Sequence, residues 1–412
     1  MAQELSVGSD IFPSFSPAEY RRRYDAVREE MAARGLDGLV IYGDSGPSEH
    51  NMANIHYLTN YSAPWFCYVL FPASGELALL IPSELHFPHA RRMSRVPDTE
   101  GVTRNYTGRL VSKLKEMGLE RGCLGLVGPG APGGSRSPGA AQQGILPYDH
   151  VQALHEGLPQ ASFQEASEVL QGVRRIKSQE EIAWMRRGAE LTDLTVYALE
   201  EQAREGMAEY ELGGIIASAY MSKEGGWPKT IYLGSTSMHS PDIVFPRQKP
   251  STRVLRKGDV VLLELSAGYW QYAGQIQRCI AVGEAPTPGY QELFDVASEV
   301  YHRIVDTLGP GKTDEDVRRA ASLLKERGYW TFDGLLHGWG LTLGPPGVDV
   351  PEVALIQRPQ NPVTFEPGMT VVVQPNVLSS DKRRGLQVGG LILITESGAE
   401  PLQKYPMKFI TV

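Results

Sequence analysis

The segment 258–282, with the sequence GDVVLLELSAGYWQYAGQIQRCIAV, decides the fold of this chain. An apolar, β-branched run covers residues 260–265, is interrupted by two small residues, and returns over 275–282. This pattern predicts a β-hairpin. Glu264 and Gln275 are polar exceptions near the inner ends of the two arms. Because side chains on one face of a sheet recur at every second residue, pairing of the arms would bring both into one cavity.

Composition and charge indicate a globular protein that does not bind nucleic acid or membranes. The 412 residues, 42% of them hydrophobic, are enough for two cores. A net charge of −8 argues against a nucleic-acid or anionic-membrane partner. The three cysteines, Cys67, Cys123 and Cys279, are too scattered for a disulfide framework. The first residues lack the features of a secretory signal, and no apolar run approaches the ~20 residues that cross a bilayer. We therefore expect a cytoplasmic protein.

Residues 1–172 alternate helical and strand patterns, which is typical of an α/β domain. A capped helix is predicted from Ser16 and Pro17, with Glu19 three residues after the cap. The segment 128–144 is rich in Gly, Pro and Ser and is predicted to be a surface loop. Strands are predicted over 38–42, 68–72, 77–81 and 123–127, and further helices over about 105–118 and 147–157.

Residues 173–412 open with a capping box, Ser178 and Glu181, before a helix from Gln179 to about Gln202. A weak internal repeat follows. The stretches that begin at Gly206 and Gly311 each lead into a helix, expected to end near residues 227 and 330, and then into strand-like segments. The repeat predicts a pseudo-twofold α+β domain with a site between its halves.

Two further polar positions complete a recognisable pattern. One is His337 in the sequence HGWG, and the other is Gln374 in MTVVVQP. Together with the hairpin, these motifs resemble the creatinase / Xaa-Pro aminopeptidase / methionine aminopeptidase family, whose fold is called pita-bread. The stretch NIHYLTNY at 54–61 resembles the signature of the N-terminal domain in its prolidase and creatinase branch. The resemblance implies an α+β, creatinase-like protein of two domains, an N-terminal α/β domain and a C-terminal pseudo-twofold pita-bread domain.

In the metal-dependent members of that family, two Asp, one His and two Glu hold two metal ions. The resemblance places these ligands at Glu264, Gln275, His337, Gln374 and Gly389. Only Glu264 and His337 remain as ligands, because neutral amide oxygens are poor substitutes for carboxylates. The resemblance therefore implies a member without a metal site, and we expect no cofactor.

The resemblance also assigns the groups that contact substrate. His239 falls where the family places a substrate-facing histidine, although a histidine beside Ser and Pro is also typical of an exposed loop. Asp333 and Gln387 stand where the peptidases often carry His and Arg, and the glutamates of creatinase fall on Gln277 and Gln374. The expected catalytic residues are His239, Glu264 and His337. The expected substrate-binding residues are Trp65, Gln275, Gln277, Asp333, Gln374 and Gln387.

Three functions are compatible with these residues. Creatinase and ectoine hydrolase share the fold, use no metal, and hydrolyse C–N bonds of small amidine- or guanidine-like molecules. Their example implies a metal-independent hydrolase or lyase of a small cationic or zwitterionic non-peptide compound, with Glu264 holding the cation and a histidine activating water. The alternatives are an inactive pita-bread module that binds a peptide or small molecule, and a metalloenzyme with another ligand set. The missing family histidines argue against Xaa-Pro cleavage, so we predict the first function.

A homodimer is also expected, in which the N-terminal domain of one chain covers the site of the other, as in creatinase-type relatives. Trp65 follows the NIHYLTNY stretch closely, and its aromatic ring would line the site of the other chain.

Overall fold

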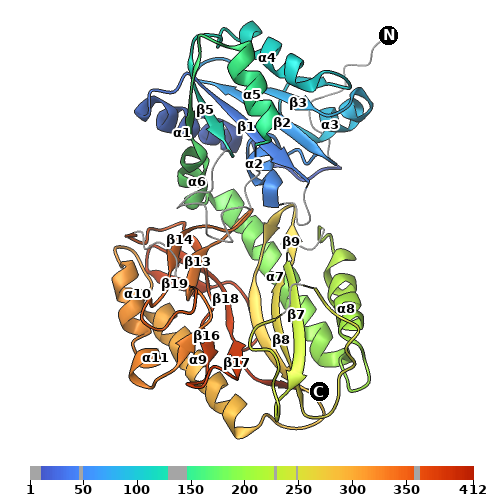
Figure 1. The fold of residues 1–412 in the computed structure, drawn as a ribbon, viewed down its shortest axis with the longest axis vertical. Helices are drawn as coiled ribbons and strands as arrows, with labels where there is room; N and C mark the ends of the chain where they lie inside the picture. Colours follow the sequence, from blue (N-terminus) through green and yellow to red (C-terminus); the bar gives the residue numbers. More distant parts are fainter. Residues whose placement is uncertain (1–10, 46–49, 129–145, 227–229, 247–248, 357–361) are drawn as a thin grey trace. The chain divides into compact units, whose positions relative to one another are not determined.

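The computed structural model describes residues 11–45, 50–128, 146–226, 230–246, 249–356 and 362–412 (Figure 1). The chain divides into two compact units at the bond between Arg174 and Arg175, and each is described by itself. Apart from Gly128, the predicted loop 128–144 lies outside the described residues. Across the described part of the chain, no helix has the length and apolar character needed to traverse a bilayer.

The first unit is a six-stranded sheet in the order β4-β3-β2-β1-β5-β6, flanked by helices. β1 pairs antiparallel with β2, β2 pairs antiparallel with β3, and the remaining pairs are parallel. Its elements are α1 (Pro17–Ala33), β1 (Gly38–Asp44), η1 (His50–Met52), α2 (Ala53–Thr59), β2 (Phe66–Pro72), β3 (Ala78–Ile81), η2 (Glu84–His86), α3 (Phe87–Met93), β4 (Asp98–Gly101), α4 (Tyr106–Glu116), β5 (Cys123–Val127), α5 (Tyr148–Gly157), β6 (Ser162–Glu165) and α6 (Ser167–Arg175).

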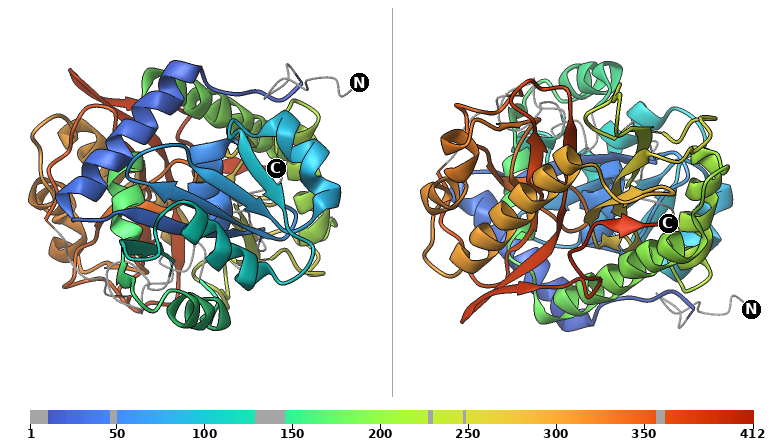
Figure 2. Two further views of the ribbon diagram at one scale, coloured as in Figure 1. Left: turned by 90° about the horizontal axis from the view of Figure 1, so that it is seen from above. Right: turned by 90° about the horizontal axis from the view of Figure 1, so that it is seen from below.

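Helices α4 and α5 cover one face of this sheet. Leu110 of α4 and Leu154 of α5 are fully buried in one core with Val40 and Leu70, which belong to β1 and β2. The left view of Figure 2 shows the blue strands with the dark blue helix α1 beside them. The predicted α/β character of the N-terminal domain is therefore confirmed.

The second unit contains a nine-stranded sheet, whose main path is β14-β13-β15-β18-β11-β8-β7, and a smaller sheet β12-β16-β17. Its elements are α7 (Gln179–Gln202), α8 (Glu209–Met221), β7 (Thr230–Ser237), β8 (Asp259–Ser266), β9 (Gly268–Tyr269), β10 (Tyr272–Ala273), β11 (Ile276–Ala281), α9 (Pro288–Thr307), α10 (Asp314–Ala320), α11 (Leu323–Glu326), β12 (Trp330–Thr331), β13 (Leu336–Gly338), β14 (Gly344–Val348), β15 (Thr370–Val373), β16 (Asn376–Leu378), β17 (Gly385–Gln387), β18 (Gly389–Thr395), β19 (Gly398–Pro401) and β20 (Ile410–Thr411).

The internal repeat predicted from the sequence is visible in this unit. One half consists of α7, α8 and the strands β7, β8 and β11, and the other of α9, α10 and the strands β13, β15 and β18 (Figure 1). The halves join where β11 pairs with β18. Two helix ends differ from the prediction, because α8 stops at Met221 and α10 stops at Ala320 before the separate short helix α11.

The predicted hairpin is the antiparallel pair β8 and β11, in which Glu264 lies opposite Gln277. Alternation gives its two faces different roles. Leu263 and Leu265 face a core that includes residues of α7 and α8, whereas Glu264 points to the opposite face. The sheet thereby buries its apolar residues under helices and keeps one polar row at the junction of the two halves.

Candidate active site

Four strands place one row of residues side by side across the junction. Tyr232 of β7 lies opposite Glu264 of β8, Glu264 opposite Gln277 of β11, and Gln277 opposite Gly389 of β18. Directly opposed residues in antiparallel strands point to the same face, with Cβ atoms about 5 Å apart. Gln374, directly after β15, extends the row beyond Gly389.

The carboxylate of Glu264 is held by two neutral amides. Its Oε1 accepts a hydrogen bond from Nε2 of Gln275 at 2.7 Å, and its Oε2 accepts one from Nε2 of Gln387 at 3.3 Å. Glu264 is buried. This contact confirms the expectation that the side chains of Glu264 and Gln275 meet, and Gln387 is brought to the same carboxylate.

The next pair in the row is Gln277 and Gln374, whose amides are joined by a 2.8 Å hydrogen bond from Nε2 of Gln277 to Oε1 of Gln374. Arg278 supports the backbone of Gln277 and of Gly389 on the neighbouring strand, since its Nη1 donates to their carbonyl oxygens at 2.8 Å and 2.7 Å. Burial lowers the pKa of the Arg278 guanidinium below its usual value. This buried cation therefore fixes the two central strands to each other through their carbonyl groups.

Three amide oxygens of this cluster accept no hydrogen bond from any residue that the structure describes. They are Oε1 of Gln275, Gln277 and Gln387, whose side chains are 1%, 0% and 1% exposed. A buried acceptor without a donor costs about 1–3 kcal/mol, and ordered water or the N–H groups of a bound molecule can satisfy it. Three such acceptors in one cluster with a carboxylate can therefore bind a molecule that carries several N–H groups.

His337 lies on the same face as this cluster. It is buried on β13 opposite Val372, two residues before Gln374 on the neighbouring strand, so alternation turns both side chains to one side. Its Nδ1 is 3.1 Å from the carbonyl oxygen of Gly338, and its ring meets that of Trp339 edge-on at 5.6 Å. His337 is therefore the histidine that the fold presents to the site.

Asp333 is positioned by Asn376, a residue that the sequence did not single out. Nδ2 of Asn376 donates to Oδ1 of Asp333 at 3.1 Å and to the carbonyl oxygen of Gln374 at 3.2 Å. Its Oδ1 accepts from the backbone N–H groups of Phe332 at 2.6 Å and Asp333 at 3.0 Å. The one available signal was the position of Asn376 two residues after Gln374.

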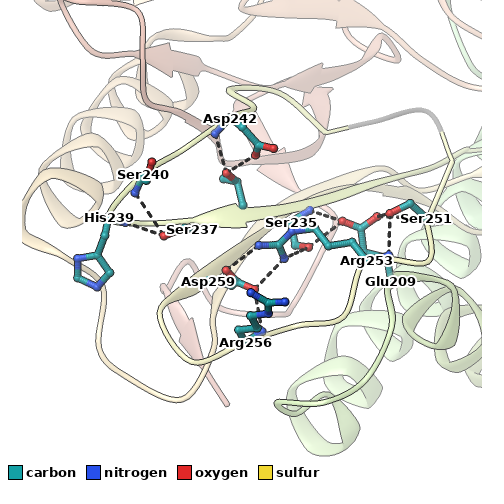
Figure 3. A network of polar contacts seen from close by, with 11 residues as sticks. Glu209, Ser235, Ser237, His239, Ser240, Asp242, Ser251, Arg253, Arg256 and Asp259 are labelled. Atoms are coloured by element: carbon teal, nitrogen blue, oxygen red, sulfur yellow. Dashed lines mark hydrogen bonds and ion pairs between the residues drawn. The ribbon is translucent and has the colours of Figure 1, made fainter.

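His239 lies outside the cluster, contrary to expectation. It follows Ser237, whose partner Asp259 is five residues before Glu264 on β8, a separation of about 16 Å along the strand. Its side chain is 65% exposed and Nε2 lies 2.8 Å from Oε1 of Glu284. Figure 3 shows its ring pointing away from the other residues drawn there. The alternative interpretation, an exposed loop histidine, describes His239, and the geometry does not support acid–base catalysis by His239 together with Glu264.

The polar network near His239 stabilises the base of the hairpin (Figure 3). Glu209 accepts hydrogen bonds from the backbone N–H and the hydroxyl of both Ser235 and Ser251. Burial raises the pKa of Glu209, but these bonds together outweigh it and hold the pKa below its usual value. Arg253 pairs bidentately with Asp259 at 2.7 and 2.8 Å. This network ties α8 to β7 and β8 and is structural.

Trp65 belongs to the first unit, where it precedes β2. Its side chain is 58% exposed, and its ring meets that of His86 edge-on at 5.5 Å. The homodimer in which Trp65 would line a neighbouring site stays a prediction. Light scattering of the purified protein at micromolar concentration tests it, and a monomer would contradict it.

The residues of the row do not fit a two-metal centre. The described residues contain no group of three or more His, Cys, Asp and Glu side chains that could hold a metal ion. A Cβ atom at Gly389 would lie 2.4 Å from Oε1 of Gln277 and 2.3 Å from the carbonyl oxygen of Val373. No side chain can therefore stand at position 389 without displacing a strand, and the amides that remain are weak ligands for divalent ions.

Comparisons with known proteins agree with this architecture. A family model described as metallopeptidase family M24 matches residues 183–396, and one described as the creatinase/prolidase N-terminal domain matches residues 23–176. An Xaa-Pro dipeptidase of Pyrococcus horikoshii is 24% identical over 87% of this chain and 92% of its own. A creatinase of a Bacillus species is 25% identical over 97% of this chain and 94% of its own.

Among solved structures, the prolidase of Pyrococcus horikoshii OT3 superposes with a TM-score of 0.75 at 23% identity and covers 94% of this chain and 100% of that one. The predicted two-domain creatinase/prolidase fold, with an N-terminal α/β domain and a C-terminal pita-bread domain, is thereby confirmed.

Proposed function

The chain belongs to metallopeptidase family M24, a family of hydrolases, and from that membership we propose that it cleaves a C–N bond of a small cationic or zwitterionic non-peptide compound without a metal ion. The observation that carries this proposal is the set of three buried amide oxygens without donors beside the carboxylate of Glu264. Such a set suits a cation whose charge is spread over several N–H groups, because each N–H can meet one acceptor.

The side chains of the row support the proposal that the reaction uses no metal ion, because few of them are good metal ligands. Glu264 is the one carboxylate of the row, and it is already engaged by two amides. A metal-ligating side chain at position 389 would need a Cβ atom there, and Oε1 of Gln277 lies only 2.4 Å from the place of that atom. We therefore propose that the similarity to the Xaa-Pro dipeptidase is one of fold and that Xaa-Pro peptides are not substrates.

The reaction needs a group that holds the cation and a group that activates water. Glu264 would form a charge-assisted contact with an amidinium or guanidinium group, whose central carbon is already electrophilic. His337 would take a proton from water as the water oxygen bonds to that carbon. The C–N bond then breaks, and the leaving nitrogen receives the proton. Gln275, Gln277 and Gln387 would hold the remaining N–H groups.

Metal content is the first test of this proposal. The purified protein should carry well under one equivalent of Mn, Fe, Co or Zn per chain by plasma mass spectrometry, because the row lacks the anionic ligands that such ions need. Chelators should leave the melting temperature unchanged, since no metal contributes to folding. Near-stoichiometric metal that survives dialysis would contradict the proposal.

A thermal-shift screen tests the class of ligand without any assumption about the reaction. A compound that prefers the folded protein raises the melting temperature by an amount that grows with its concentration relative to its dissociation constant. Guanidines, amidines, cyclic amidines and betaines should be compared with Xaa-Pro dipeptides. Stabilisation by N–H-bearing cations supports the proposal, and stabilisation by the dipeptides alone would contradict it.

A further inference from the structure

We infer that Tyr232 determines specificity at this site by donating a hydrogen bond from its hydroxyl to the acidic group of a zwitterionic ligand whose cation lies against Glu264. The inference rests on the proposed function and makes it narrower, because it selects zwitterions over simple cations. No sequence motif marks Tyr232, which lies in the edge strand β7.

The register of the sheet places Tyr232 in the site. It is the cross-strand partner of Glu264, so the two side chains leave the sheet on the same face and start about 5 Å apart. Its neighbours Ile231 and Leu233 face the opposite side, where they pack in the core beneath α7 and α8. Tyr232 itself is half-buried. The phenol is longer than the glutamate side chain, so its hydroxyl can stand farther from the sheet than the carboxylate.

The other groups of the cluster offer mainly acceptors to a ligand. Three amide nitrogens each use one of their two N–H groups inside the cluster, because Nε2 of Gln275 and of Gln387 donate to Glu264 and Nε2 of Gln277 donates to Gln374. The oxygens that remain are acceptors. These acceptors would repel an acidic group on a ligand. Such a group needs an O–H or N–H donor from the protein. The hydroxyl of Tyr232 makes no hydrogen bond to any residue in the described part of the chain and can supply one.

The electrostatic surroundings keep this hydroxyl a donor. Burial raises the pKa of Tyr232, and the negative charge of Glu264 raises it further. The phenol therefore carries its proton throughout the neutral pH range. A ligand can place its cation low against Glu264 and its acidic group higher, on the side of β7, where Tyr232 stands.

The test compares methylguanidine with guanidinoacetate, which adds a carboxylate to the same cation. Isothermal titration calorimetry should be carried out on the wild-type protein, on Tyr232→Phe and on Tyr210→Phe, a matched control on the exposed side of α8. Tyr232→Phe should lose affinity for guanidinoacetate by roughly 10-fold or more, as expected when a hydrogen bond to a charged group is removed. Its affinity for methylguanidine should change by less than about threefold, and the control should match the wild type.

Two results would overturn the inference about Tyr232 and leave the proposed function standing. One is unchanged guanidinoacetate affinity in Tyr232→Phe while the wild type binds both probes. The other is an equal loss for both probes, which would mean that Tyr232 acts through Glu264. A wild-type protein that binds neither probe would instead overturn the proposed function for guanidino compounds, and the inference with it. The melting temperature of each variant shows that the fold is retained.

Discussion

Glu264→Gln is expected to abolish ligand binding and turnover while the protein remains folded. Glu264 is the anionic group against which a cation would lie, and its carboxylate already orients two amides. Loss of a charge-assisted contact costs roughly 1.5–3 kcal/mol, which corresponds to about 10–150-fold in the dissociation constant. Turnover should fall further, because the cation would no longer be held beside the group that activates water.

Stability gives an independent readout on the same variant. An ionised carboxylate is costly to bury, whereas glutamine has nearly the same shape, so the unfolding free energy should stay within about 1 kcal/mol of the wild type or rise. Glu284→Gln is the matched control, since Glu284 pairs with His239 away from the row. Calorimetric titration with the compounds identified by thermal shift provides the measurement. Unchanged affinity in Glu264→Gln would show that Glu264 does not bind the cation.

Much of the site could be predicted because its strands alternate in a regular way. Glu264 and Gln275 stand out as polar residues in apolar arms, and the pairing of those arms is enough to predict that the two side chains meet. Their contact at 2.7 Å follows from the hairpin itself. The resemblance to a known family supplied His337, Gln374 and Gln387, which come from segments more than 60 residues away.

The residues that were missed or misplaced depend on register between distant strands. Tyr232 joins the site because β7 pairs with β8 in one register, and a shift by one residue would turn it to the other face. His239 lies outside the site because β7 extends to Ser237, so the loop that follows begins at the opposite end of β8 from Glu264. Neither the end of an edge strand nor its register can be derived from local composition. Most hydrogen bonds of Asn376 are to backbone groups, so its spacing from Gln374 was the one signal in the sequence.

Gln277 and Gly389 illustrate a dependence that only the packing of the strands reveals. Read separately in the sequence, they are a polar substitution and a missing ligand. In the structure they are cross-strand partners, and Oε1 of Gln277 fills the volume that a Cβ atom at position 389 would need. The long amide and the glycine therefore depend on each other through packing, and a change at one position has consequences at the other.

Gly389→Ala is accordingly expected to destabilise the protein by about 3 kcal/mol or more. The added Cβ would lie 2.3 Å from the carbonyl oxygen of Val373 and 2.4 Å from Oε1 of Gln277, so β15 and β18 would have to separate. Gly390→Ala is the matched control in the next position. A Cβ there meets first Oε1 of Gln403 at 3.1 Å, which has to shift by only a few tenths of an ångström, so the cost should stay well below that of Gly389→Ala. Urea denaturation of both variants measures the difference.

The double variant Gln277→Ala/Gly389→Ala separates the two causes of that loss. Shortening Gln277 removes the side-chain clash but leaves the carbonyl oxygen of Val373 in place, so stability should recover only in part. Full recovery would mean that Gln277 alone keeps position 389 empty, and a carboxylate could then be restored there together with the others. Partial recovery would mean that the strands themselves have closed over the position. In that case Gly389→Glu should bind no divalent ion even beside a shortened Gln277, because the backbone leaves no room for the first carbon of the ligand.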